Sequence, residues 1–373
     1  MEKNLSKLKT FIIMKKNILL ISSKAITINN FFDVFVKNKK YNFFLGCSDV
    51  KNLKLKNKNV RLFFDSKIKN LLNPFFFFSN LFKNYFKINN LKFDLILVNS
   101  PVAALYFRII GFLLKKKVVY IVHGFRFHSN EKNFKSYIFY IYEKLFSLIT
   151  YYYIVLNDED YKIVNNKFNI HKKNILKIPS IGIDYYKLIK IKPKKRKKKL
   201  NIGVISAYRE NKGYPDLLQI AKNLKTKNIN AVFNCYGYDD KSKYLKKIKY
   251  YKLKNIFLNG YEEKIYNKIK NFDLVCHFSK REGMPISLLE AISIGIPVIC
   301  YNIRGNNDII KNNYNGYLIR PYDLQDFEKK LIKVYKNKNK LNNLKNNCKK
   351  SISPGHDKKF IKLKISNFIN DIR

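Results

Sequence analysis

The stretch SKREGMPISLLEAISIGIPVICYNIRGNND, residues 279–308, carries the local pattern that decides the fold prediction. An apolar run of strand length, Asp273–Phe278, leads into it, and a turn at Gly283 opens a helical segment over Ile286–Ile292. A second short apolar run, Pro297–Tyr301, follows that helical segment. Apolar runs of this length that alternate with helical segments predict parallel strands joined by helices.

The same alternation extends outward from this stretch in both halves of the chain. Strands with following helices are expected at Asn17–Ser22 with Ile28–Val36, and at Leu200–Ile205 with Tyr214–Leu224. Further strands are expected at Phe93–Asn99, Val118–His123, Ile154–Leu156, Ala231–Tyr236 and Asn255–Leu258. Repeated strand–helix units predict an α/β fold with two Rossmann-like, doubly wound parallel sheets.

The charge run KIKPKKRKKK, residues 190–199, lies almost midway along the 373 residues and predicts a solvated linker. A chain of this length is expected to form two domains. We expect one Rossmann-like domain over 1–188, a second over 189–350, and a C-terminal helix over 351–373 that crosses back to the first domain. Ligands of such sheets bind at the carboxyl ends of the strands, so the active site is expected in the cleft where the two domains face each other.

The composition is strongly basic, with 75 lysines and arginines against 26 acidic residues and a formal net charge of +49. A charge of this size favours nucleic acid or an anionic membrane surface as partner. The enriched residue types, Lys, Asn, Ile, Phe and Tyr, also have codons rich in A and T, and only 13 glycines are present, so we expect a genomic base bias to be the main cause. A basic nucleic-acid-binding protein stays as an alternative, against which the sequence offers no basic–aromatic cluster and no zinc spacing.

The apolar runs and the cysteines indicate how the chain relates to membranes and to the redox state of its compartment. The apolar run at 11–14 is too short for a signal peptide, and Glu143 and Lys144 interrupt Tyr137–Leu156, which we expect to be a helix and then a buried strand. Leu71–Phe82, with Phe75–Phe78 in a row, is expected either to lie on a membrane or to belong to the core. The five cysteines lack metal or redox spacing, and four of them follow or lie in apolar runs, which indicates buried thiols in a reducing cytosol. They are Cys47, Cys235, Cys276, Cys300 and Cys348.

Two carboxylates flank the start of the helical segment in residues 279–308. Glu282 and Glu290 are eight residues apart, and each can accept several hydrogen bonds from a hydroxyl-rich ligand. Pro285 suits the first helical position, and the N–H groups there can bind a phosphate or sugar hydroxyls. Gly283 would let a ligand approach the backbone closely. An ordinary turn glutamate and a surface helix glutamate are the alternative.

This stretch resembles the donor-binding signature of the retaining family 4 glycosyltransferases, which have the GT-B fold. The matching residues, in order, are Glu282, Gly283, Pro285, Glu290, Ala291, Gly295, Pro297, Val298 and Gly305. The resemblance implies that Glu282 contacts the transferred sugar and that Glu290 holds the nucleotide ribose. It also implies that the backbone of Gly283, Met284, Pro285 and Ile286 binds the sugar.

The segment SAYRENKG, residues 206–213, resembles the loop with which this family holds the donor diphosphate. Lys212 and Gly213 match, whereas Ala207 stands where the family has an arginine, and Arg209 lies three residues before the lysine. The resemblance implies that Lys212 stabilises the leaving phosphate as a point charge, with Arg209 as a substitute for the missing arginine.

Three further segments extend the resemblance. VHGFRF, residues 122–127, resembles the HG segment of the acceptor domain, which implies that His123 faces the sugar and Gly124 lies at the acceptor. Ser22 and Ser23 occupy the strand-end loop where many relatives have paired glycines, and would also contact the acceptor. Tyr261 is in the turn that would line the nucleotide base. A metal site at His123 and His128 is the alternative, but their spacing is poor for it.

The resemblance implies an enzyme of bacterial capsule, O-chain or exopolysaccharide synthesis. It would transfer a hexose or N-acetylhexosamine from a nucleotide-sugar to a lipid-linked or glycan acceptor with retention of configuration. A UDP-sugar is the donor that we expect. The domain over 1–188 would bind the acceptor, and the domain over 189–350 the donor. A GT-B epimerase or phosphorylase stays as an alternative.

The resemblance also bears on cofactors and location. Asp158, Glu159 and Asp160 resemble the acidic triplet that holds a metal in the other major glycosyltransferase fold, but we expect them, with Asn157 or Asp158 as cap, to begin a helix. No cofactor and no metal are therefore expected. The enzyme is expected in the cytoplasm, peripherally bound to the anionic inner face of the cell membrane, without nucleic acid as partner.

Overall fold

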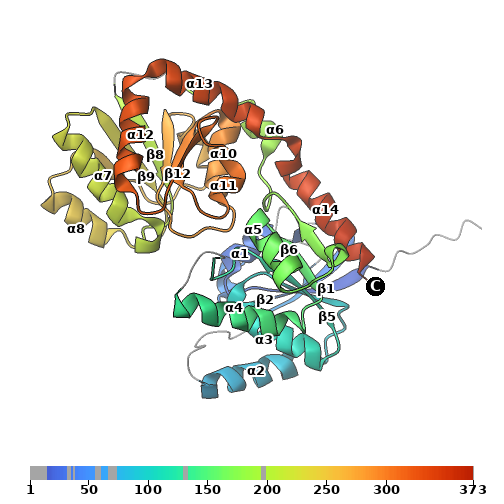
Figure 1. Ribbon diagram of the computed structural model, residues 1–373. Coiled ribbons are helices and arrows are strands. Elements are labelled where there is room, and N and C mark those ends of the chain that lie inside the picture. Colours follow the sequence, from blue (N-terminus) through green and yellow to red (C-terminus); the bar gives the residue numbers. More distant parts are fainter. Residues whose placement is uncertain are drawn as a thin grey trace, which may run out of the picture. The chain divides into compact units, whose positions relative to one another are not determined.

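The computed structural model describes residues 15–31, 35–36, 38–54, 60–65, 74–128, 133–194 and 199–372 (Figure 1). Contacts divide the chain into two compact units. Unit 1 comprises Met1–Ile121 and Leu148–Tyr152, and unit 2 comprises Val122–Ser147 and Tyr153–Arg373. These bounds differ from the boundary expected at the charge run, of which residues 195–198 lie outside the described residues; the division into an acceptor and a donor domain stays a prediction.

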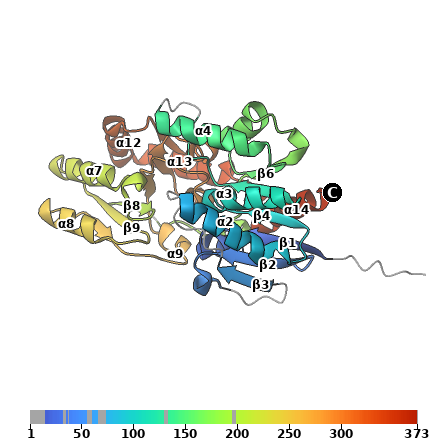
Figure 2. The ribbon, with the colours of Figure 1, turned by 90° about the horizontal axis from the view of Figure 1, so that it is seen from below.

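The first sheet has seven strands in the order β3-β2-β1-β4-β5-β6-β7. The strands are β1 (Lys16–Ile21), β2 (Tyr41–Cys47), β3 (Val60–Asp65), β4 (Leu95–Val98), β5 (Lys117–Val122), β6 (Tyr152–Val155) and β7 (Ile175–Lys177). Figure 2 shows β1, β2 and β3 as neighbours, and β1 pairs in parallel with both β2 and β4. The central β1 is apolar on both faces and buried from Ile18 to Ile21, as expected of a parallel strand covered on both sides.

The helices of the first half are α1 (Ala25–Phe31), α2 (Pro74–Asn89), α3 (Pro101–Leu113), α4 (Phe134–Ser147) and α5 (Asp158–Lys162). Ser100 begins α3, because its side chain accepts a hydrogen bond from the N–H of Ala103 and Pro101 fits the first turn. The helix expected over Ile28–Val36 is α1, which ends at Phe31; residues 32–34 lie outside the described part of the chain. The expected helix and strand within Tyr137–Leu156 are confirmed as α4 and β6.

The second sheet has six strands in the order β10-β9-β8-β11-β12-β13. These are β8 (Leu200–Ile205), β9 (Ala231–Tyr236), β10 (Ile256–Leu258), β11 (Leu274–His277), β12 (Val298–Tyr301) and β13 (Gly316–Ile319). The order of the strands reverses between β8 and β11, and in doubly wound sheets ligands bind beside such a reversal, at the carboxyl ends of the strands. The predicted α/β fold with doubly wound parallel sheets is confirmed.

Helices cover both faces of the second sheet. The helices of this half of the chain are α6 (Tyr185–Leu188), α7 (Tyr214–Thr226), α8 (Ser242–Tyr250), α9 (Tyr266–Ile269), α10 (Ile286–Ile294), α11 (Asn306–Ile309), α12 (Leu324–Lys336), α13 (Lys338–Cys348) and α14 (Lys358–Asp371). Figure 1 shows α7 and α12 on one face and α10 and α11 on the other. Val204, Leu217 and Phe327 belong to the core on the first face, and Leu288 and Ile292 to the core on the second.

Two expectations on burial can be compared with the structure. All five cysteines are buried and free, whereas burial was predicted for four of them. In α2, Phe77 stacks on Tyr106 with ring centroids 4.8 Å apart, whereas Phe75, Phe76 and Phe78 are 76%, 47% and 55% exposed. One phenylalanine of this segment therefore packs inward while its neighbours are exposed, and contact with a membrane stays a prediction. Residues 71–73 lie outside the described residues. Within the described chain, no helix combines the length and apolarity needed to cross a membrane.

Candidate active site

The loops after β8 and β11 meet at the reversal of the second sheet. The loop after β8 forms the short helix η5 (Glu210–Lys212) and then turns at Gly213, which has a φ of 76°. A Cβ built on Gly213 would overlap the carbonyl group of Phe278, the residue that follows β11. Glycine at this position therefore lets the two loops lie against each other, and it brings Lys212 to the segment that carries Glu282.

Lys212, Glu282 and His277 form a polar cluster at this junction. The Nζ of Lys212 lies 2.6 Å from Oε1 of Glu282, and the Nε2 of His277 lies 3.0 Å from the same oxygen. His277 is the last residue of β11 and is buried. The structure thus brings together two of the three residues predicted to be catalytic and adds a histidine that the sequence analysis did not select.

The cluster determines the charge of Glu282. Burial alone would raise the pKa of its carboxyl group, but the ammonium group of Lys212 and the hydrogen bond with His277 lower that pKa to about 2. The carboxylate is therefore ionised at neutral pH. An ionised carboxylate that is held from two sides is a well-placed acceptor for sugar hydroxyl groups.

The N-terminus of α10 follows directly after this cluster. The helix begins at Ile286, as the helical pattern predicts, but Pro285 is extended and occupies the N-cap position instead of the first helical position. No side chain caps this end, so the first N–H groups are open to an anion or to hydroxyl groups.

Glu290 lies in the second turn of α10 and is half-buried. Burial raises the pKa of its carboxyl group to about 7; the charge of Lys358 lowers the pKa and that of Asp184 raises it. Among the hydrogen bonds and ion pairs of the described residues, none involves this carboxyl group. It is therefore available to a ligand, as the predicted ribose contact requires.

The His123 loop, residues 123–127, packs on the Glu282 turn, residues 282–284. Gly124 has a φ of 100°, and a Cβ built there would lie 3.1 Å from the Cα of Gly283. A Cβ built on Gly283 would overlap the carbonyl oxygen of His123. The expectation that Gly283 admits a ligand to the backbone thus needs correction on one side of the residue, because main chain already fills that space.

The imidazole of His123 is neutral at physiological pH. Burial lowers the pKa of His123 to about 4. A neutral imidazole can donate from one nitrogen and accept at the other, which suits contact with sugar hydroxyl groups. Met284 and Ile286, whose backbone was predicted to bind the sugar, are half-buried at this end of α10.

The other predicted site residues do not join this cluster by a described contact. Arg209 pairs with Asp239, with Nη2 3.1 Å from Oδ1, so its guanidinium is occupied. Tyr261 is 66% exposed in the loop after β10. Their roles as donor contacts stay predictions.

Ser22 and Ser23 belong to unit 1, where internal hydrogen bonds hold them. The Ser22 hydroxyl is buried and bonds with that of Thr27, and the Ser23 N–H donates to the Ser100 hydroxyl over 2.9 Å. A contact between the Ser22 hydroxyl and an acceptor would have to break the bond to Thr27.

The acidic triplet at 158–160 begins α5, as expected. Asn157 is the N-cap and accepts a hydrogen bond from the N–H of Asp160. Asp160 itself is buried against Arg304, at 2.9 Å between Nη1 and Oδ1. The sequence analysis missed this pair, because the two residues are 144 positions apart and nothing local marks them as partners. In the described chain no three His, Cys, Asp or Glu side chains could hold a metal ion together, and metal independence stays a prediction.

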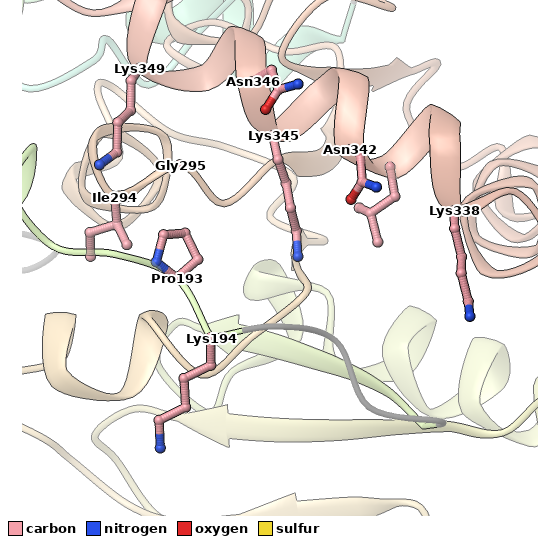
Figure 3. Close-up of a pocket in the computed structure, with 10 residues that line it drawn as sticks. Pro193, Lys194, Ile294, Gly295, Lys338, Asn342, Lys345, Asn346 and Lys349 are labelled. Carbon is pink, nitrogen blue, oxygen red and sulfur yellow. The ribbon is translucent and has the colours of Figure 1, made fainter.

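A pocket of about 650 Å³ lies at the other end of α10 (Figure 3). Its lining includes Gly295 and lysines of α13 and the adjacent turn, and contains none of the predicted site residues. Lys349 donates to the carbonyl oxygens of Ile189 and Ile191, and Lys345 lies 3.4 Å from Asp273. Because this pocket contains none of the predicted site residues, the polar cluster at the N-terminus of α10 remains the candidate active site.

Comparisons with known proteins show which proteins this chain is similar to. Residues 186–351 match the family model described as Glycosyl transferases group 1. An Escherichia coli protein named UDP-Gal:alpha-D-GlcNAc-diphosphoundecaprenol alpha-1,3-galactosyltransferase is 29% identical over 285 residues, which cover 71% of this chain and 72% of the relative.

Solved structures of GT-B enzymes are similar to this chain over most of its length. HepE from Anabaena, determined with UDP and glucose, has a TM-score of 0.72 and 15% identity, covering 96% of this chain and 100% of that one. A variant of TarM from Staphylococcus aureus, determined with UDP, has a TM-score of 0.63 and 22% identity over 78% of this chain. This chain covers 59% of that TarM chain. At these identities the likeness shows the fold, which is GT-B.

Proposed function

The chain belongs to the group 1 glycosyltransferases through its domain at residues 186–351, and from this premise we propose that it uses a UDP-sugar as donor. It transfers a hexose or an N-acetylhexosamine to a lipid-linked or glycan acceptor, with retention of configuration, in the synthesis of a surface polysaccharide. The E. coli relative supports this proposal, since its name gives a UDP-sugar as donor and a sugar diphosphoundecaprenol as acceptor.

The observation that carries the proposal is the cluster of Lys212, Glu282 and His277 beside the uncapped N-terminus of α10. A cation and a helix N-terminus are the two groups that bind a diphosphate without a metal ion. The buried, ionised carboxylate of Glu282 supplies the acceptor for sugar hydroxyls. Glu290 in the next turn supplies a second carboxyl group for the ribose.

The reaction follows from these positions. The bond between the anomeric carbon and the diphosphate oxygen breaks, and Lys212 with the α10 N-terminus stabilises the charge that develops on the phosphate. A bond forms between the same carbon and the acceptor oxygen on the same face of the sugar. The acceptor proton passes to the departing phosphate oxygen. Glu282 and the neutral His123 orient the sugar during this exchange.

The proposal that the enzyme binds a membrane rests on exposed apolar side chains of two helices. In α2 the exposed residues are Phe75, Phe76, Phe78, Phe82 and Phe86, and in α4 they are Phe134, Tyr137, Ile138, Ile141 and Leu145. Lysines flank these stripes in both helices, which suits an anionic lipid surface. We propose that the enzyme binds the inner face of the cell membrane from the cytoplasm, where a lipid-linked acceptor is accessible.

A donor panel with and without a lipid-linked acceptor tests the function. We expect release of UDP from one UDP-sugar only when the acceptor is present, and NMR of the product should show the anomeric configuration of the donor. Lys212→Ala should lower turnover by at least about 100-fold, as loss of a group that stabilises developing charge does. Lys246→Ala, an exposed lysine of α8, is the matched control and should leave turnover unchanged.

Other outcomes of that panel would contradict the proposal. Conversion of a UDP-sugar to its epimer without acceptor would indicate an epimerase. Turnover that requires inorganic phosphate would indicate a phosphorylase. An inverted anomeric configuration would contradict retention alone and leave the transferase assignment in place.

A further inference from the structure

Arg304 lies in the turn after β12, and its enclosed guanidinium binds the main chain of two other segments. Nη1 donates to the carbonyl oxygen of Phe127 over 3.0 Å, and Nη2 donates to that of Phe125. Nε donates to the carbonyl oxygen of Glu282 over 3.5 Å. One side chain thus connects the His123 loop to the Glu282 turn.

Asp160 and Asn157 close the connection from the other side. Oδ1 of Asp160 accepts from Nη1 of Arg304 over 2.9 Å and from the N–H of Phe125 over 3.4 Å. Oδ2 accepts from Nδ2 of Asn157 over 2.7 Å, and the same Nδ2 donates to the carbonyl oxygen of Gly283 over 3.0 Å. The carbonyl groups of both Glu282 and Gly283 are therefore bound by a network that also binds the His123 loop.

Stability alone is a weak reason for this arrangement. Burying an ion pair costs hydration free energy, and the attraction between the two charges offsets only part of that cost. Apolar residues of similar size often stabilise the fold equally well. The planar fork of an arginine supplies something else, which is several donors in a fixed geometry. Here the fork sets the distance between two segments that carry His123 and Glu282.

We propose that Arg304 and Asp160 are positioning residues that hold the His123 loop and the Glu282 turn in one geometry, and that they set the rate of sugar transfer rather than the affinity for the nucleotide. The proposal rests on the function proposed above, in which both His123 and Glu282 face the transferred sugar. Glu290, the proposed ribose contact, takes no part in the network as described. A small displacement of groups around a reacting centre can lower a rate about 100-fold while binding elsewhere persists.

Arg304→Lys is the first test, because lysine keeps the charge beside Asp160 but cannot reach the carbonyl groups of Phe125, Phe127 and Glu282 together. We expect kcat to fall about 100-fold, while the Kd for UDP, measured by calorimetry, changes less than about threefold. Lys177→Met is the matched control, since Lys177 makes an exposed ion pair with Asp158, which lies in helix α5 together with Asp160. It should leave both kcat and Kd unchanged.

Arg304→Met combined with Asp160→Leu is the second test, because it removes both charges and leaves neither one buried alone. We expect the thermal unfolding midpoint to stay close to that of the wild type while kcat remains as low as in Arg304→Lys. Wild-type kcat in the double variant would overturn the proposal, since the pair would then serve stability only. A parallel loss of UDP affinity and kcat in Arg304→Lys, or loss of the folded state in both variants, would overturn it as well.

Hydrogen–deuterium exchange of the full chain gives a result that does not depend on turnover. In Arg304→Lys, amides of residues 123–127 and 282–284 should exchange faster together, while those of the α7 helix keep their rates. Acceleration of one segment without the other would overturn the coupling. If the wild type transfers no sugar but the joint acceleration occurs, the proposed function fails and the coupling of the two segments stands.

Discussion

Two glutamates eight residues apart have pKa values shifted in opposite directions. Glu282 is held by Lys212 and His277, which outweigh its burial and lower its pKa to about 2. Glu290 is half-buried and has no such partner among the described residues, so burial raises its pKa to about 7. The spacing alone made them a matched pair, whereas their environments give one a permanent charge and the other a charge that depends on pH.

Glu290→Gln is expected to remove a pH dependence of stability. Because the pKa of Glu290 is about 7 in the folded chain and about 4.3 in an unfolded one, the native state binds the proton more tightly between these values. This contribution is fully present below about pH 4 and is lost as pH rises through 7. The variant should therefore unfold at a higher temperature than the wild type at pH 8 and at a similar temperature at pH 5, as calorimetry would measure. Glu263→Gln, at an exposed site, is the matched control for the substitution itself.

Glu290→Ala is expected to weaken nucleotide binding more than it slows chemistry. A charged, partly buried hydrogen bond to the ribose would contribute about 1.5–3 kcal/mol. Calorimetric titration with UDP should show this loss, with a smaller effect on kcat. Unchanged affinity for UDP would rule out the ribose contact.

At the scale of elements, the packing of loops on loops explains why the motif contains glycine. The main chain of His123 lies directly against Gly283, and the main chain of Gly283 lies against Gly305. A side chain at Gly283 or Gly305 would push apart segments that carry predicted site residues. The sequence analysis attributed Gly283 to ligand access, because contacts between distant loops cannot be read from a local pattern.

Gly283→Ala is expected to lower kcat by at least about 100-fold, because the added methyl group would overlap the carbonyl oxygen of His123 and displace the loop. Gly355→Ala is the matched control, since a Cβ there has no neighbour closer than 3.4 Å. Turnover and thermal unfolding of both variants would measure the difference. Full activity of Gly283→Ala would mean that the His123 loop is not fixed during the reaction.

Elements with clear boundaries in the sequence were predicted best. The strands β8 and β9 begin and end at the residues expected, because charged or polar residues and turns bound each apolar run. The strands β2, β3, β7 and β13 were not predicted; β2 has polar Asn42 within it and lysines just before it, β7 has only three residues and β13 only four. In the site, spacing identified Glu282 and Glu290, but His277 and Arg304 acquire their roles only through tertiary contacts.

At the scale of the whole molecule, the proposed membrane binding would use the exposed phenylalanines of α2. Phe77 stacks on Tyr106, so its replacement would test folding. Phe75→Asp with Phe78→Asp changes exposed side chains only. We expect reversible, salt-sensitive binding of the wild type to anionic vesicles, in which each lysine near the lipid contributes about 1 kcal/mol, and weaker binding of this variant.

Flotation with vesicles of neutral and anionic lipid would measure that binding. Phe77→Asp serves as the control for folding and should lower the unfolding temperature, while the exposed double variant should not. Equal binding of the wild type to neutral and anionic vesicles would contradict the electrostatic part of the proposal. Unchanged binding of the double variant would move the docking surface away from α2.

The proposed reaction needs a source of positive charge at the diphosphate, and here Lys212 and the N-terminus of α10 supply it. We therefore expect turnover to persist in EDTA at the rate measured without it. Complete loss of activity in EDTA that Mn²⁺ or Mg²⁺ restores would show that the diphosphate requires a cation from solution.

The contacts around the glycines bear on how this sequence has changed over time. Glycine codons begin with two guanines, so a genome biased toward A and T replaces them wherever the replacement is harmless. Glycines that survive such mutational pressure mark positions where selection has acted against every alternative. Most of the glycines described here either have main chain or a ring where a Cβ would stand or have a positive φ, and Gly355 has neither. In related chains from similarly biased genomes, we therefore expect Gly283, Gly305 and Gly213 to be kept even where Gly355 has been replaced. The number of lysines in those chains is expected to follow the base composition of the genome alone.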